Sequence, residues 1–462
     1  SFSADASRAF PAGMIGRVVS TDPKRVIVQT ESTDQTYALV AFDPRSGGVT
    51  ELVPSRPDAV LHICQRVGDS ILAWYQDGKK YTLHRFDLDG NPKPFMVDGQ
   101  ERPHIEPADL GMPDWCNPGL SFTGDENSTS FTDFTVNSKL KSTRTFRIDL
   151  NSGALIPRLS GKEVDLDESK FVEYHGTFEA RDGYPVPAHL WIPKSKLADV
   201  PEPLEIENGV LKKIHFRDGE KRMAQSDSYG SIGIVLNRGW NIYHQERLAE
   251  GVAVLEVGSR GGGEAGASSR NDGARNRQLT INDSSDSGYW LQMLGFDHRV
   301  DYGRSWGGWR AENGAVDDPL AFTHRISAVS AGDANRLVVN GPEFWSVHDW
   351  GAYMDPNTGE TELATLAMEQ ANELSTPSRF RKHRGPLPSM LFYVQDDDDR
   401  AEPGSPQRTM NVLEQRFGQH NPRFSMISLP GGHGARRDRP FIGMWLRSQF
   451  GNFAPFEDQI KS

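Results

Sequence analysis

The first third of the chain alternates short apolar runs with polar turn residues, a pattern typical of β-strands joined by hairpins. Three of these runs lead into an Asp and a glycine-containing turn, where the Asp side chain can form an Asx-turn and the Gly can adopt a positive φ. The three Asp residues are Asp43, Asp87 and Asp149. The step from Asp43 to Asp87 matches the roughly 40–50 residues of one four-stranded propeller blade, and the longer step to Asp149 fits a blade with a longer loop. We therefore predict an all-β, propeller-like domain over residues 1–170, with a β-sandwich of similar hairpins as the alternative.

The predicted propeller is short. Residues 10–165 provide only about three or four blades of that size. Either the ring is small and open, or further propeller residues lie outside this sequence.

A different pattern begins near Phe171. A hairpin-like stretch over 178–193 is followed by apolar strand patterns that alternate with helix-length segments. This alternation predicts a second domain over 171–462, built on a mostly parallel sheet with helices on both faces. The polar and irregular stretch 195–230 predicts an insertion or loop. The predicted strands are 231–236, 253–257, 299–302, 326–331, 389–394 and 424–429.

A motif for nucleophilic catalysis lies directly after one predicted strand. Gly303, Ser305 and Gly307 form Gly-x-Ser-x-Gly, followed by a run that is compatible with a helix. In a nucleophile elbow the serine occupies a strained strand-to-helix turn, and small residues two positions away allow that turn. The motif also occurs by chance in glycine-rich sequences. Its place between a strand and a helix is what favours Ser305 as a nucleophile.

A serine nucleophile needs a base, and the base needs an orienting carboxylate. In α/β-hydrolases they follow in the order Ser, acid, His, on loops after later strands. Here the strand 389–394 is followed by the Asp run 396–399, and the strand 424–429 is followed by a glycine-rich loop that contains His433. The alternatives are a solvated acidic loop or weak Ca²⁺ site for the Asp run, and a surface histidine for His433.

Composition argues against several other classes of function. Lys plus Arg number 51 against 63 Asp plus Glu, a net charge of -12, which argues against a nucleic-acid partner. No stretch approaches the roughly 18–20 apolar residues of a membrane helix, so we expect a soluble protein without a membrane partner.

The first residues lack the basic and apolar regions of a signal peptide, so we expect the peptide to be absent or removed. The compartment stays open between cytoplasm, periplasm and secretion. Cys64 and Cys116 are too few for a disulfide scaffold or a thiolate metal site. We expect buried free thiols, with one disulfide as the alternative, and neither a metal nor a cofactor.

Taken together, four sequence blocks resemble the prolyl oligopeptidase family of serine peptidases, in which a β-propeller is joined to an α/β-hydrolase domain. The likeness covers roughly residues 172–450, and the propeller only by its repeat pattern. The blocks are Arg-Gly-Gly-Gly-Glu at 260–264, the Ser305 elbow, Asp-Asp-Arg at 398–400 and Gly-His-Gly-Ala at 432–435. The resemblance implies that Ser305 is the nucleophile, His433 the base and Asp398 the acid, with Asp396 and Asp397 as the alternatives for the acid.

The resemblance also implies residues that contact the substrate. The backbone N–H of Trp306 would be one oxyanion donor, and Arg400 matches an arginine that binds a substrate carbonyl. The family's second donor is a tyrosine in a Tyr-Gly-Gly-Phe-Asn block, and the comparable block here begins at Asn237, whose amide can donate. Trp350 and Tyr353 lie where the family often has aromatic pocket walls, although they can equally be core or surface aromatics.

We therefore expect a serine peptidase that hydrolyses short or flexible peptides through an acyl-enzyme. An acylaminoacyl peptidase, an esterase or an isopeptidase acting on constrained peptides such as lasso peptides would use the same triad. A catalytically silent peptide-binding protein that keeps the fold is the third possibility.

Overall fold

The computed structural model describes residues 16–22, 25–31, 37–56, 58–77, 80–114, 116–119, 122–125, 127–160, 165–236, 239, 241–334, 369–434 and 439–450. Contacts divide the chain into two compact units. The first ends at Leu166 and the second begins at Asp167, close to the predicted boundary after residue 170. The described residues within 237–245 group with the first unit, which no sequence pattern predicted.

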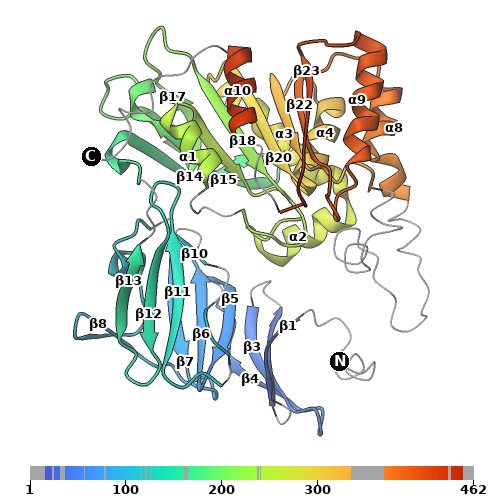
Figure 1. Ribbon diagram of the computed structural model, residues 1–462. Coiled ribbons are helices and arrows are strands. Elements are labelled where there is room, and N and C mark those ends of the chain that lie inside the picture. The colour runs from blue at the N-terminus through green and yellow to red at the C-terminus, as the bar shows by residue number, and fades with distance from the viewer. Residues whose placement is uncertain are drawn as a thin grey trace. The chain divides into compact units, whose positions relative to one another are not determined.

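The first unit consists of consecutive antiparallel sheets (Figure 1). Each strand pairs with the strand that precedes or follows it in the sequence, as in propeller blades, so the predicted propeller-like fold is confirmed. One sheet contains β1 (Gly16–Asp22), β2 (Arg25–Glu31), β3 (Tyr37–Phe42) and β4 (Val49–Val53), and the next contains β5 (Val60–Val67), β6 (Ser70–Gln76) and β7 (Tyr81–Phe86). The others are β8 (Phe95–Val97) with β9 (Gln100–Arg102), and β10 (Asn117–Pro118), β11 (Phe131–Asn137), β12 (Arg144–Asp149) and β13 (Leu155–Ser160).

The three Asp turns of this unit form as predicted. Asp149 Oδ1 accepts hydrogen bonds of 2.9 Å from the N–H groups of Asn151 and Ser152, and Asp43 and Asp87 accept from the backbone in the same way. The turn glycines have positive φ: 72° at Gly47, 85° at Gly90 and 77° at Gly153. Cys64 and Cys116 are buried free thiols, as predicted.

The second unit contains an eight-stranded sheet with the order β14-β15-β19-β18-β20-β21-β22-β23. The first two strands are antiparallel to their neighbours, and all later pairs are parallel. This confirms the α/β-hydrolase architecture. The strands are β14 (Phe171–Glu179), β15 (Pro185–Pro193), β18 (Met223–Ser228), β19 (Ala253–Val257), β20 (His298–Arg304), β21 (His324–Ala328), β22 (Ser389–Gln395) and β23 (Phe424–Leu429).

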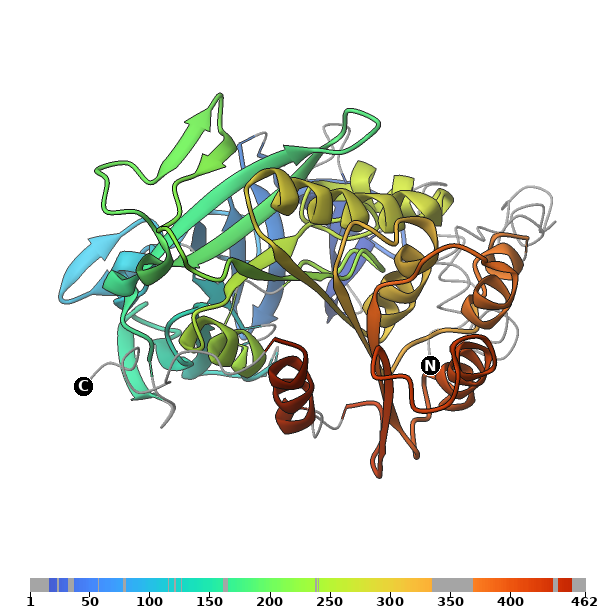
Figure 2. The same cartoon turned by 90° about the horizontal axis from the view of Figure 1, so that it is seen from above.

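Helices cover both faces of the sheet (Figure 2). In this view α3 (Arg277–Met293) and α4 (Trp306–Asp317) lie on one face, and α10 (Arg439–Phe450) lies on the other. None of the helices within the described ranges is long and apolar enough to cross a lipid bilayer. The remaining helices are α1 (Ile242–Ala249), α2 (Gly266–Arg275), α8 (Thr376–Lys382) and α9 (Gly404–Phe417).

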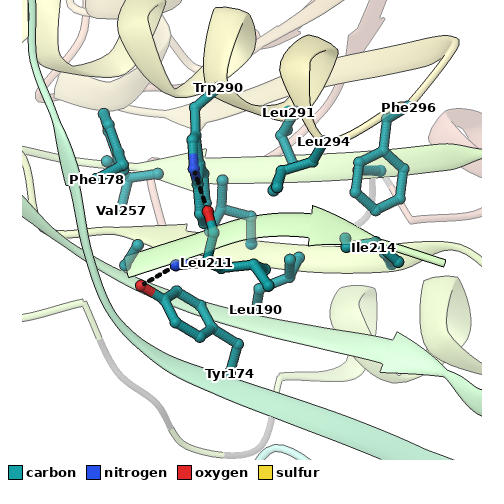
Figure 3. Close-up of a cluster of buried hydrophobic side chains, with 14 of the residues drawn as sticks. Tyr174, Phe178, Leu190, Leu211, Ile214, Val257, Trp290, Leu291, Leu294 and Phe296 are labelled. Carbon is teal, nitrogen blue, oxygen red and sulfur yellow. Dashed lines mark hydrogen bonds between the residues drawn. The ribbon is translucent and has the colours of Figure 1, made fainter. Parts of the chain in front are cut away.

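The stretch 195–230, predicted as an insertion or loop, is not an irregular loop. It contains a hairpin of β16 (Leu204–Glu207) and β17 (Val210–Ile214) as well as β18. The hairpin is fixed to the core (Figure 3). The Leu211 N–H donates to the Tyr174 hydroxyl at 3.2 Å, and Trp290 Nε1 donates to the Leu211 carbonyl at 3.3 Å. Leu211 is buried in the same apolar cluster as both aromatic side chains. Packing against the core therefore orders a segment whose surface is polar.

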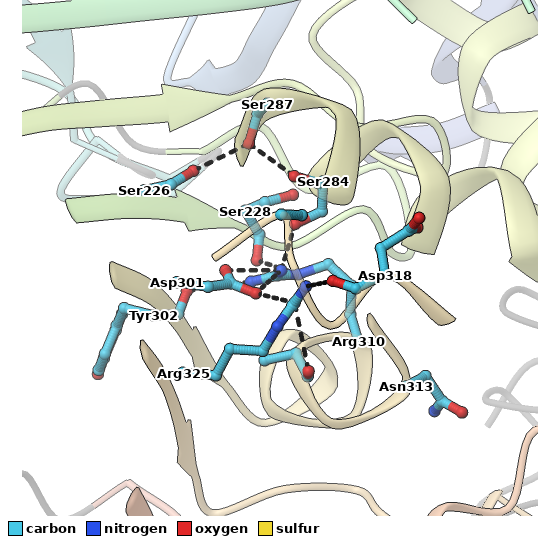
Figure 4. A network of polar contacts seen from close by, with 12 residues as sticks. Ser226, Ser228, Ser284, Ser287, Asp301, Tyr302, Arg310, Asn313, Asp318 and Arg325 are labelled. Carbon is cyan, nitrogen blue, oxygen red and sulfur yellow. Dashed lines mark hydrogen bonds and ion pairs between the residues drawn. The ribbon is translucent and has the colours of Figure 1, made fainter. Parts of the chain in front are cut away.

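The predicted strand 231–236 is wrong, because the strand of this region is β18. Residues 231–236 are mostly apolar, but Ile232 and Gly233 have φ values of 45° and 67°, which no extended strand accommodates. The true strand has four polar residues among its six and is buried at every position. Its serines find partners inside the protein: Ser226 Oγ lies 3.3 Å from Ser287 Oγ (Figure 4), and Ser228 Oγ lies 2.6 Å from Ser259 Oγ.

Candidate active site

Ser305 lies between the end of β20 and the start of α4, with φ 58° and ψ −118°. A residue with a side chain rarely adopts this conformation, so the turn is strained. A Cβ on Gly303 would lie 2.0 Å from the Gly307 carbonyl oxygen, and a Cβ on Gly307 would lie 2.9 Å from the Ser228 carbonyl oxygen. Both flanking glycines of the motif are therefore required by the close approach of backbone, as a nucleophile elbow demands.

A continuous hydrogen-bond chain joins Ser305, His433 and Asp398. His433 Nε2 lies 2.9 Å from Ser305 Oγ, and His433 Nδ1 lies 2.8 Å from Asp398 Oδ2. The three residues follow β20, β23 and β22, whose carboxyl ends lie at one edge of the parallel sheet. The side chain of Asp398 is 1% exposed and that of His433 is 13% exposed. The imidazole therefore has an inner carboxylate partner and an outer hydroxyl partner.

The other carboxylates of the Asp run have different partners. Asp397 Oδ2 accepts from the Gly431 N–H at 3.2 Å, and Asp396 accepts from the Ser428 hydroxyl. These bonds join the Asp loop to the end of β23 and to the loop that precedes His433. Asp399 is exposed. In the run 396–399, Asp398 is thus the residue whose carboxylate meets the imidazole.

Asp398 is held as a carboxylate. Its Oδ1 accepts hydrogen bonds from the N–H groups of Arg400 at 2.9 Å and Ala401 at 2.8 Å. Burial raises the pKa of Asp398, but the hydrogen bonds from His433 and from these two N–H groups outweigh burial, so its pKa lies below the usual value. The group is ionised at neutral pH and accepts from the imidazole.

Two arginines lie near the triad. Arg304 Nη2 donates to the His433 carbonyl oxygen at 2.8 Å, a contact that sequence reasoning missed because Arg304 is a variable position of the elbow motif. Arg400 is exposed beside the Asp loop.

Of the two predicted oxyanion donors, Trp306 lies within the described residues and Asn237 does not. Trp306 is the first residue of α4, where the helix dipole is positive. Asn237, Trp350 and Tyr353 lie outside the described residues. Their predicted roles stay predictions.

Sequence reasoning missed Tyr229, the residue directly after β18. Its ring is partly buried, and its Cδ2 lies 3.8 Å from the position of a Cβ on Gly307, so the ring flanks the elbow. The signal was the pair Tyr229-Gly230, which matches the start of the Tyr-Gly-Gly-Phe-Asn block better than Asn237 does. A strand at 231–236 would have Asn237, and not Tyr229, directly after it.

No protein-family model matches the sequence, and no curated protein does. Solved structures do match. One from a study of two prolyl endopeptidases has a TM-score of 0.69 at 17% identity and covers 92% of this chain and 57% of its own. Prolyl oligopeptidase B from Galerina marginata matches with a TM-score of 0.69 at 15% identity when bound to a 25mer macrocyclization substrate, covering 94% of this chain and 56% of its own.

The same enzyme bound to a 35mer hydrolysis and macrocyclization substrate gives a TM-score of 0.70 at 16% identity, with 94% of this chain and 57% of that chain covered. The chain therefore spans little more than half the length of these structures. Identities this low report on the fold. The chain has the fold of the prolyl oligopeptidases, with a propeller-like β unit and an α/β-hydrolase unit.

Proposed function

We propose that the chain is a serine hydrolase that cleaves peptide bonds through an acyl-enzyme on Ser305. The observation that carries the proposal is the hydrogen-bond chain from Asp398 through His433 to Ser305 Oγ. This is the arrangement of a nucleophile, a general base and an orienting carboxylate. The strained φ of 58° at Ser305 adds support, because a residue without a function at this turn would be expected to be glycine.

In the proposed reaction, Ser305 Oγ attacks the substrate carbonyl carbon while His433 Nε2 accepts the hydroxyl proton. Asp398 accepts from the Nδ1–H group and thereby keeps Nε2 available as the base. The imidazolium then gives its proton to the leaving amine, and the acyl-enzyme forms as the amine departs. Water repeats the cycle with His433 as base and releases the acid.

The carbonyl oxygen becomes negatively charged in the tetrahedral intermediate and needs donors. We assign the backbone N–H of Trp306 as one donor, since it opens α4 directly after the nucleophile. As the second donor we assign the Tyr229 hydroxyl rather than the Asn237 amide, because the Tyr229 ring flanks Gly307 at the elbow. In serine proteases one such donor is worth roughly 3–4 kcal/mol of transition-state stabilisation.

Peptides are the proposed substrate class. Two of the matching structures carry 25mer and 35mer peptide substrates, and the shared fold supports a similar class here. Arg400, exposed beside Asp398, is the proposed contact for a substrate carbonyl. The hydrogen-bonded triad geometry argues against a silent binding protein.

Labelling with a fluorophosphonate probe and peptide mapping test the proposal. We expect label on Ser305, loss of labelling in Ser305→Ala and His433→Ala, and hydrolysis of a mixed peptide library by the parent alone. Ester, N-acyl and isopeptide substrates in the same assay separate the related hydrolases. The proposal is overturned if label appears on a different serine, or if Ser305→Ala hydrolyses peptides within tenfold of the parent.

A further inference from the structure

Two arginines lie buried beneath the candidate active site. Arg277 is the first residue of α3, Arg310 lies on α4, and both are 0% exposed. A buried guanidinium is costly unless its donors are used. Where these donors point therefore indicates what the two side chains do.

The two guanidiniums hold the backbone on either side of Tyr229. Arg310 Nε donates to the Ser228 carbonyl oxygen at 3.2 Å, and Arg277 Nη1 donates to the Gly230 carbonyl oxygen at 3.1 Å. The carbonyls immediately before and after Tyr229 are thus each bound by a buried arginine.

The same two side chains reach the nucleophile elbow. Arg310 Nη2 donates to the Tyr302 carbonyl oxygen at 3.0 Å, two residues before the end of the strand that leads to Ser305. The guanidinium of Arg277 lies over the Trp306 ring, 4.9 Å from the ring centroid. Each arginine therefore links the Tyr229 turn to the elbow, one before the nucleophile and one after it.

Arg310 is itself fixed by charge. Its Nη1 lies 2.8 Å from both carboxylate oxygens of Asp301, and Asp301 also binds Arg325 Nη1 at 2.5 Å (Figure 4). The side chains of all three residues are 0% exposed. Because a guanidinium is a planar fork with fixed directions, a buried carboxylate partner leaves it little freedom.

We propose that Arg277 and Arg310 are positioning residues that set the distance between the Tyr229 hydroxyl and the Trp306 N–H. The inference rests on the proposed function. Oxyanion donors are effective only when they are held in place before the charge develops, and an error of about 1 Å costs roughly 10²-fold in rate. The two donors here come from different strands, so their spacing depends on what joins those strands.

Arg277 is the better residue to test, because loss of Arg310 would leave Asp301 and Arg325 in an incomplete buried ion cluster. Arg277→Met removes the hydrogen bond to Gly230 and the charge above Trp306. Arg277→Lys keeps the charge but lacks the planar fork.

Arg299→Met is the matched control. Arg299 is also buried, and its guanidinium also donates to backbone carbonyl oxygens, those of Ala321 and Phe296, each at 2.9 Å. It lies at the opposite end of β20 from Ser305, roughly 20 Å away by strand geometry.

We expect Arg277→Met to lower kcat on a cleaved peptide by roughly 10²-fold with KM changed less than threefold, and Arg277→Lys to lose less. Arg299→Met should lower the melting temperature as much but keep kcat within threefold. The combination of Arg277→Met with Tyr229→Phe should be no worse than Tyr229→Phe alone, because both changes remove the same donor.

Three outcomes would each overturn this inference and leave the proposed function standing. They are an unchanged kcat in both Arg277 variants, a kcat loss in Arg299→Met equal to that in Arg277→Met, or losses that multiply in the double variant. If Arg277→Met fails to fold, Arg277→Lys and its combination with Tyr229→Phe decide by the same criteria. Peptide hydrolysis by Ser305→Ala at the parent rate would instead overturn the proposed function, and the inference with it.

Discussion

Replacing Asp398 by Asn should remove most of the activity and leave the binding of substrate intact. The Asp398 carboxylate accepts from His433 Nδ1 at 2.8 Å and from two backbone N–H groups at 2.8 and 2.9 Å. An amide can keep the backbone contacts through its oxygen, which turns its NH₂ group toward the imidazole. The NH₂ group can only donate, so Nδ1 must become the acceptor and the ring proton moves to Nε2.

The consequence appears at the nucleophile. An Nε2 that carries the proton cannot accept from Ser305 Oγ, although the two atoms remain 2.9 Å apart. In serine proteases this loss of tautomer costs about 10⁴ in kcat. At 1.36 kcal/mol per factor of ten, the barrier should rise by about 5.4 kcal/mol.

The assay is steady-state hydrolysis of a peptide that the parent cleaves, with the neighbouring carboxylates as matched controls. Asp399→Asn should stay within about twofold of the parent, because exposed residues away from the reacting atoms contribute little. Asp396→Asn and Asp397→Asn should lose less than tenfold, since these carboxylates bind Ser428 of β23 and the Gly431 N–H and not the imidazole. A large loss at one of these positions, or an Asp398→Asn variant with nearly full kcat, would refute the reasoning.

Three further outcomes follow from the same geometry. Ser305→Ala and Ser305→Gly should both lose about 10⁶ in kcat, and Ser305→Gly should be about 1–3 kcal/mol more stable to urea than Ser305→Ala, because glycine relieves the strain at φ 58°; equal stabilities would contradict a strained elbow. Tyr229→Phe should lower kcat by about 10²–10³ without changing KM, whereas Asn237→Ala should cost little; the reverse result in steady-state kinetics would return the second donor to Asn237. Because the pKa of Asp398 is lowered in the folded state, its contribution to stability is present above the pKa of the unfolded chain, roughly 4, and is lost as the pH falls through the folded value. The stability difference between the parent and Asp398→Asn should therefore be greatest near pH 7 and shrink below about pH 4, and a difference that grows in urea titrations at acid pH would exclude an ionised Asp398.

Local chemistry made much of this fold predictable. Asp149 and the glycine at 153 form the predicted turn because an Asx-turn depends on the residues within it. The elbow at Ser305 was predictable for a related reason, since the space beside Gly303 and Gly307 excludes any side chain. The order of Ser305, Asp398 and His433 along the chain matched the order of strands that bring them to one sheet edge.

The parts that could not be predicted depend on distant contacts. β18 is a buried central strand in which four of the six residues are polar, and Ser226 and Ser228 are tolerated there only because Ser287 and Ser259 meet them. No periodicity signals such a strand. Tyr229 was missed with it, because its proposed role depends on its place directly after β18. The β16–β17 hairpin likewise owes its order to Tyr174 and Trp290, residues far from it in the sequence.

The ion cluster of Asp301, Arg310 and Arg325 has a consequence for how this sequence can change over generations. Removing one member leaves an uncompensated charge in the interior, which typically costs about 3–5 kcal/mol and approaches the whole stability margin of a domain. Replacing all three with well-packed apolar residues is often neutral or stabilising by about 1–4 kcal/mol. Sequences that carry the cluster can therefore reach the apolar alternatives by single changes only through intermediates that lack one member and are unstable. A library that is selected for stability and varies these positions together can reach the apolar alternatives, whereas one that varies them singly will recover only the parent residues.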